Sequence, residues 1–91
     1  MSKSSKRHLF NIQQLGCILC KHLNLGESPA EIHHIEGFGR SSYTDFLTVP
    51  LCPEHHRSAN GVHGLSRRGF ANRYKVSELD LLGMTLQELN R

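Results

Sequence analysis

The sequence contains no tryptophan, and aromatic residues make up only 7% of its 91 positions. A chain of this length buries a low fraction of its surface when it folds, so its hydrophobic core is marginal. Apolar residues of all kinds reach 37%, which does not make up for the missing aromatic side chains. We therefore expect a small domain that a bound metal ion helps to hold together, in preference to a large packed core.

Long hydrophobic runs and a secretory signal are also absent from the sequence, which favours a cytoplasmic protein over a membrane or secreted one. The three cysteines are an odd number and do not suit a disulfide framework. Two of them, Cys17 and Cys20, have the short spacing of a metal knuckle. A redox pair is the alternative, although no strand-helix-strand pattern surrounds them.

Positive charge is unevenly distributed along the chain. Residues 1–75 contain ten lysines and arginines against five acids, a balance of +5, whereas residues 76–91 contain one arginine against three acids. The basic part favours a polyanionic partner such as nucleic acid, and an ordinary solvated surface is the alternative. The arginines that we expect to contact phosphate groups are Arg40, Arg57, Arg67, Arg68 and Arg73.

The first half of the chain predicts an arm followed by a β-hairpin. Residues 1–8 have too few apolar side chains to pack, and we expect them to form a flexible basic arm. Residues 9–15 suit either a helical turn or a short strand. Alternation of polar and β-branched residues predicts a strand over Glu31–Ile35, and Phe46–Val49, ended by Pro50, is the second strand after a long connection.

The second half of the chain predicts helices, which complete a single domain over residues 9–91. A helix is expected over Glu54–Asn60, because a proline precedes it and a glycine follows it. A short basic helix is expected over Leu65–Tyr74. Ser77 and Thr85 each precede an acid by three residues, which is typical of two capped helix starts. The predicted fold class is therefore α+β, with short C-terminal helices.

One group of candidate metal ligands is rich in sulfur. Cys17 and Cys20 form one pair, Cys52 and His55 form another, and each pair can be presented by one turn. A site of three thiolates and one imidazole has no open position, which is typical of structural zinc. A zinc-finger reading with His33 as third ligand is the alternative, although no suitably spaced fourth ligand follows on a helix.

A second group of candidates contains no sulfur. His33 and His34 fall on the first predicted strand, His56 follows the second pair of zinc ligands, and Asn60 or His63 lies beyond. Imidazole and oxygen ligands that leave positions open suit a catalytic ion. Neighbouring residues of a strand point to opposite sides, so one histidine can bind the ion while the other acts as a base.

These residues resemble the motifs of the HNH, or ββα-metal, nucleases. His33 and His34 match the first element of the motif, Asp45 stands near the middle position, and Cys52–His56 match the final knuckle and histidine. More narrowly, three stretches are similar to the phage recombination-enhancement, or Ref-type, nucleases. They are EIHHIEGFGR, DFLTVPLCPEHH and GVHG, at residues 31–40, 45–56 and 61–64.

The resemblance implies a small ββα-metal domain and a role for each matched residue. His33 and His56 would bind a divalent ion, and His34 would be the general base. The third ligand in the family often comes one helical turn after the second, which is Asn60 here, but His63 is the better ligand and is preferred. Asp45 would orient the base. The catalytic residues implied are thus His34 and Asp45, next to a separate zinc knuckle.

The implied activity is metal-dependent hydrolysis of DNA that leaves 5′-phosphate and 3′-hydroxyl ends, with RNA as an alternative substrate. The catalytic ion would be Mg²⁺, Mn²⁺, Ni²⁺ or Zn²⁺. The resemblance also implies a bacterial or phage-infected cell and a recombination protein as partner. The rival hypothesis is a catalytically silent, zinc-stabilised module that binds nucleic acid. His8 and His22 lie outside both groups and are assigned no role.

Overall fold

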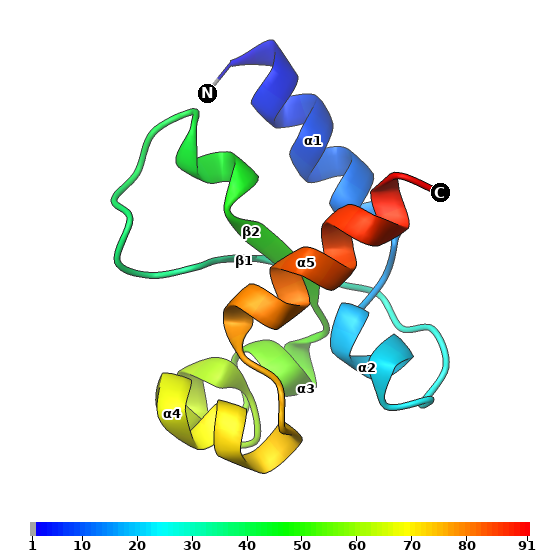
Figure 1. Cartoon of the computed structure of the whole chain (residues 1–91), viewed down its shortest axis with the longest axis vertical. Coiled ribbons are helices and arrows are strands. Elements are labelled where there is room, and N and C mark those ends of the chain that lie inside the picture. Colours follow the sequence, from blue (N-terminus) through cyan, green and yellow to red (C-terminus); the bar gives the residue numbers. More distant parts are fainter. Residues whose placement is uncertain (1) are drawn as a thin grey trace.

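A computed structural model describes residues 2–91 of the chain, and Met1 lies outside the described residues (Figure 1). At the centre is a two-stranded antiparallel sheet of β1 (Glu31–His34) and β2 (Thr48–Leu51). Both strands lie close to the predicted ones, and a long connection joins them, so the predicted hairpin is confirmed. The sheet positions the residues on which the functional argument depends.

The second strand begins and ends later than the prediction of Phe46–Val49. A short 3₁₀ helix, η1 (Thr44–Phe46), occupies the start of that range. Pro50 does not end the strand but lies within it, paired with Ile32. Both strands of a two-stranded sheet are edge strands, where the missing N–H of proline is tolerated.

The first helix, α1 (Lys3–Gln14), packs against the sheet and against η1. Its first turn is closed by a capping box in which the side chains of Ser2 and Ser5 bond to each other's backbone N–H. The predicted flexible arm over residues 1–8 is therefore wrong from residue 3 onward. Ser5 and Ile12 are fully buried two turns apart on one face, so packing stabilises a helix that the polar composition does not indicate.

Three helices follow in the middle of the chain: α2 (Ile18–His22), α3 (Pro53–His56) and α4 (Val62–Tyr74). α3 is a single turn, shorter than the helix predicted over residues 54–60. α4 starts one turn earlier than predicted and is kinked at Ser66, whose φ of 68° and ψ of 166° are not helical. The tight connection between α3 and α4 brings His63, at the start of α4, next to His33 of β1.

The chain closes with one helix, α5 (Glu78–Leu89), instead of the two short helices predicted there. Its start at Ser77 is capped as predicted, with Asp80 completing the capping box. Thr85 does not start a second helix, because its buried hydroxyl donates to the carbonyl of Leu81 inside α5. A threonine that bonds back to its own helix in this way does not interrupt it.

The helices surround the sheet, and α1 and α5, from the two ends of the chain, pack against each other and against β2 (Figure 1). The buried hydrophobic core is formed by α2, β2, α4 and α5 and by residues that flank the helices. Its buried residues are Cys17, Ile18, Leu19, Cys20, Val49, Leu51, Cys52, Val62, Phe70, Val76 and Leu81. No helix within residues 2–91 is both long and apolar enough to cross a membrane. The observed class is a small α+β fold.

Candidate functional site

The sulfur-rich ligands meet where α2 and α3 begin. Cys17 precedes α2 and Cys52 precedes α3, and Cys20 and His55 lie one turn further along these helices. All four side chains are buried, and their ligand atoms lie within 4.8 Å of one another. His33 belongs to a different cluster, which contradicts the zinc-finger alternative. The two short pairs therefore form one four-ligand cluster, which we call the knuckle.

The distances within the knuckle suit a tetrahedral ion. The sulfurs of Cys20 and Cys52 are 3.7 Å apart, and Nδ1 of His55 lies 3.3 to 3.7 Å from the three sulfurs. Zinc bonds of about 2.3 Å to sulfur and 2.0 Å to nitrogen give tetrahedral edges of roughly 3.8 and 3.5 Å. Burial raises the pKa of the Cys17 thiol to about 12, so a zinc ion would displace its proton on binding. The knuckle is compatible with structural zinc.

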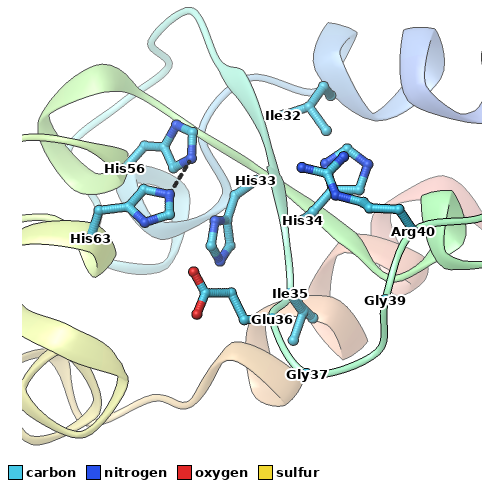
Figure 2. Close-up of a pocket in the computed structure, with 10 residues that line it drawn as sticks. All are labelled: Ile32, His33, His34, Ile35, Glu36, Gly37, Gly39, Arg40, His56 and His63. Carbon is cyan, nitrogen blue, oxygen red and sulfur yellow. Dashed lines mark hydrogen bonds between the residues drawn. The ribbon is translucent and has the colours of Figure 1, made fainter.

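The second cluster consists of His33, His56 and His63, whose ligand nitrogens also lie within 4.8 Å of one another. Nε2 of His56 and Nε2 of His63 are 3.1 Å apart, and the ring of His33 stands edge-on to both (Figure 2). The amide of Asn60 donates to Glu54, and Asn60 is not among the residues that line the cavity beside the three histidines. Of the two candidates for a third ligand, His63 is the one whose nitrogen lies beside those of His33 and His56.

Local backbone structure explains why the two clusters can share α3. Neighbouring helical side chains diverge by about 100°, so His55 points into the knuckle while His56 joins the second cluster. His63 reaches that cluster because α4 starts in a tight turn. A Cβ on Gly64 would collide with the backbone oxygen of Ser58. Glycine is therefore required where the chain doubles back from α3 to α4.

The second cluster can hold a divalent ion. Metal–nitrogen bonds of about 2.0 to 2.1 Å give N···N edges of roughly 2.9 Å at right angles and 3.4 Å in a tetrahedron. The 3.1 Å separation of the His56 and His63 nitrogens lies between these values. Nδ1 of His33 is buried and has no hydrogen-bond partner among the described residues, as expected of a nitrogen that serves as a ligand.

Carboxylates fix two of these imidazoles from behind. Glu78 lies 2.6 Å from Nε2 of His33, and Glu31 lies 2.9 Å from Nδ1 of His56. Burial lowers the pKa of His56, although the bond to Glu31 opposes this shift. Burial also works against ionisation of Glu78, but its contacts with His33 and Arg67 lower its pKa overall. The cluster therefore combines a neutral His56 imidazole with an ionised Glu78 carboxylate.

His34 lies on the opposite side of β1 from His33, as the alternation of a strand predicts (Figure 2). Its Nε2 lies 3.0 Å from Oδ1 of Asp45. The hydrogen bond from His34 lowers the pKa of the Asp45 carboxyl, which is therefore ionised at neutral pH. Thr48 donates to the backbone oxygen of Asp45 at 2.8 Å and holds η1 in place. An ionised acceptor on Nε2 leaves Nδ1 of His34 free to take a proton.

The histidine cluster and His34 border the same open cavity, which has a volume of about 460 Å³ (Figure 2). The loop after β1 forms part of its wall, with Gly37 and Gly39 at φ values of 97° and 75° that other residues rarely adopt. Arg40 adds a positive charge to the same wall. The residues that line the cavity are Ile32, His33, His34, Ile35, Glu36, Gly37, Gly39, Arg40, His56 and His63.

The five predicted phosphate-binding arginines fall into two groups. Arg57 donates two hydrogen bonds of 3.0 and 2.9 Å to Glu31. Arg67 forms an ion pair with Glu78 at 2.7 Å. Arg40, Arg68 and Arg73 are exposed and form no ion pair within residues 2–91. Three of the five charges are therefore available to a polyanion, and two are neutralised in place.

Neither of the two glutamates that contact the histidine cluster, Glu31 and Glu78, was predicted from the sequence. Glu31 could have been found, because it lies two residues before His33 and so on the same face of β1. Glu78 carries no comparable signal, because 45 residues separate it from His33. Only the packing of α5 against the sheet brings it to the site.

The sequence model of one family, described as recombination enhancement, RecA-dependent nuclease, matches residues 2–90. The matched residues include both clusters of candidate metal ligands, η1 and all of α5. No curated protein and no solved structure matches the chain.

Proposed function

The chain belongs to the family of recombination-enhancement, RecA-dependent nucleases, and from this premise we propose that it is a metal-dependent DNA endonuclease of the HNH type. The proposed ββα-metal unit is β1, β2 and α3, in the order in which they occur. It carries His33 and His34 on its first strand and His56 on its helix. The knuckle would hold this unit together through a structural zinc.

One observation carries the proposal. Three imidazoles, His33, His56 and His63, converge beside an open cavity, and His34 borders the same cavity with its ring held by Asp45. A set of three nitrogen ligands leaves coordination positions for a substrate, whereas a purely structural site would be closed. An ion site with open positions and a histidine base beside it supply a Lewis acid and a proton acceptor, the two groups with which an enzyme can hydrolyse a phosphodiester.

When bound, a divalent ion supplies a Lewis acid that stabilises charge on the scissile phosphate and the leaving oxygen. The chain itself supplies the base and its orientation. Nδ1 of His34 takes a proton from the attacking water. Asp45 accepts a hydrogen bond from Nε2–H of the same ring and stabilises the resulting imidazolium. Arg40, in the cavity wall, is positioned to contact a flanking phosphate. We expect products with 5′-phosphate and 3′-hydroxyl ends.

Plasmid nicking tests this proposal. The purified protein is incubated with supercoiled DNA and Mg²⁺, Mn²⁺, Ni²⁺ or Zn²⁺, with and without RecA and a nucleotide, because the family description names that recombinase. We expect cutting in at least one arm and none in excess EDTA. DNA binding without cutting under every condition would instead indicate a zinc-stabilised nucleic-acid-binding module.

A second measurement tests the proposed ligands. Protein purified without chelator should hold one tightly bound zinc per chain and bind a second, exchangeable ion. His63→Ala should weaken binding of the second ion, whereas Asn60→Ala, a matched change in the same turn, should not. An opposite result would move the third ligand to Asn60.

A further inference from the structure

Two of the candidate metal ligands, His33 and His56, each contact a glutamate that in turn contacts an arginine. Nε2 of His33 bonds to Oε2 of Glu78 at 2.6 Å, and Oε1 of Glu78 forms an ion pair with Nε of Arg67 at 2.7 Å, although without hydrogen-bond geometry. The second example is His56, Glu31 and Arg57: Nδ1 of His56 is 2.9 Å from Oε1 of Glu31, which also accepts from Arg57. The site thus contains two His–Glu–Arg chains, each running from a ligand imidazole to an arginine.

The geometry determines which ring nitrogen carries the proton. An ionised carboxylate can only accept a hydrogen bond, so a neutral imidazole beside it must present an N–H to it. A metal-bound His33 would keep its proton on Nε2, which faces Glu78, and would offer the lone pair of Nδ1, the nitrogen that is buried without a partner. In His56 the proton lies on Nδ1, and the lone pair on Nε2 faces His63. Both free nitrogens point into the cluster.

The two His–Glu–Arg contacts differ in how exposed their glutamates are, so we expect them to differ in their effect on metal binding. The side chain of Glu78 is 6% exposed and that of Glu31 is 34% exposed. Water can replace Glu31 as an acceptor more easily than it can replace Glu78. The contacts through Glu78 also extend to the cavity wall, because Nη2 of Arg67 donates to the backbone oxygen of Glu36 at 2.9 Å.

We infer that Glu78 is a positioning residue, which fixes the tautomer and orientation of His33 for metal binding, and that Arg67 holds Glu78 in place instead of contacting DNA. Glu31 and Arg57 do the same for His56, with a smaller effect. The inference rests on the proposed function, because it assumes that the histidine cluster binds an ion. It assigns a role at the metal site to α5, for which the sequence indicated only packing.

The first experiment reads the tautomer directly in the wild-type protein. Long-range ¹H–¹⁵N correlation spectra of the zinc-loaded protein, recorded without a second ion, distinguish Nδ1–H from Nε2–H imidazoles. We expect His33 to be the Nε2–H form and His56 the Nδ1–H form. The opposite tautomer of His33 would overturn the inference, and this result does not depend on whether any variant folds.

The second experiment measures metal affinity. Calorimetric titration with Mn²⁺ should show that Glu78→Gln weakens binding by about 10- to 100-fold, the usual effect of losing a partner behind a metal ligand. Arg67→Met should weaken it less, and Glu88→Gln, on the same helix but paired with Lys21 and Arg91, should have no effect. Circular dichroism verifies that each variant is folded.

The outcomes separate the inference from the function on which it rests. Equal Mn²⁺ affinity in wild type and a folded Glu78→Gln variant would overturn the role of Glu78 alone. No binding of Mn²⁺, Ni²⁺ or Zn²⁺ to the histidine cluster of the wild type would overturn the proposed function and this inference together. An unchanged affinity in Arg67→Met, combined with a lower affinity for DNA, would return Arg67 to the phosphate-binding group.

Discussion

Asp45 and His34 are in hydrogen-bond contact, with Oδ1 of Asp45 3.0 Å from Nε2 of His34, although eleven residues separate them. The carboxylate belongs to η1 and the imidazole to β1. This contact fits the role proposed for Asp45, because a buried carboxylate on one ring nitrogen leaves the other as the proton acceptor. It also allows the base to be tested separately from the metal ligands.

His34→Ala should reduce DNA cleavage by about 10² to 10⁴-fold, which is the usual contribution of a general base. Asp45→Asn should also reduce it, by no more than His34→Ala does, because the ring remains but loses its charged partner. Single-turnover plasmid nicking measures both rates. Neither variant should change the zinc content or the affinity for the second ion. Undiminished cutting by His34→Ala would refute the assignment of the base.

Cys17→Ser should release the structural zinc and unfold the chain, because metal-binding energy at such a site is also folding energy. Excess chelator should have the same effect on the wild type. Zinc content by elemental analysis, together with circular dichroism, measures both changes. His22→Ala is the control, since that exposed histidine lies outside the knuckle. A soluble, folded Cys17→Ser protein would contradict a stabilising role for the knuckle.

The parts of the site that could be predicted depend on short-range patterns. Cys17 and Cys20, like Cys52 and His55, are three residues apart, and one helical turn brings each pair together whatever the rest of the chain does. Alternation along β1 predicts that neighbouring histidines point to opposite sides. These relations are local, so the sequence contains them.

The parts that could not be predicted depend on packing between distant segments. Ser5 is polar, yet it is fully buried against the rest of the fold, and this orders a helix where composition predicts an arm. Thr85 matches a helix-start signal, but its hydroxyl is used inside α5. Glu78 reaches His33 across 45 residues. For Ser5 and Glu78 a tertiary contact outweighs the local preference, as it commonly does for a weak signal, whereas the hydroxyl of Thr85 is bonded within its own helix.

The arginines allow a test of DNA binding that does not depend on cleavage. Arg40→Ala should weaken binding and reduce the slope of log Kd against log salt by about 0.9, the contribution of one phosphate contact. Arg57→Ala is the matched control, because Glu31 already neutralises that charge. Fluorescence anisotropy at about 50 to 200 mM salt measures the slope. A larger change of slope for Arg57→Ala than for Arg40→Ala would show that Arg57, and not Arg40, contacts phosphate.

The start of α5 should make stability depend on pH. The backbone N–H and hydroxyl side chain of Ser77 bond to Asp80 and lower its pKa in the folded state. A carboxyl with a lowered folded pKa stabilises the fold above its unfolded pKa of about 3.9, and this contribution is lost as the pH falls. Asp80→Asn should therefore be less stable than wild type at pH 6, with a difference that shrinks towards pH 3, as urea unfolding would show. Glu88→Gln controls for the lost charge, and a constant difference would contradict the role of Asp80.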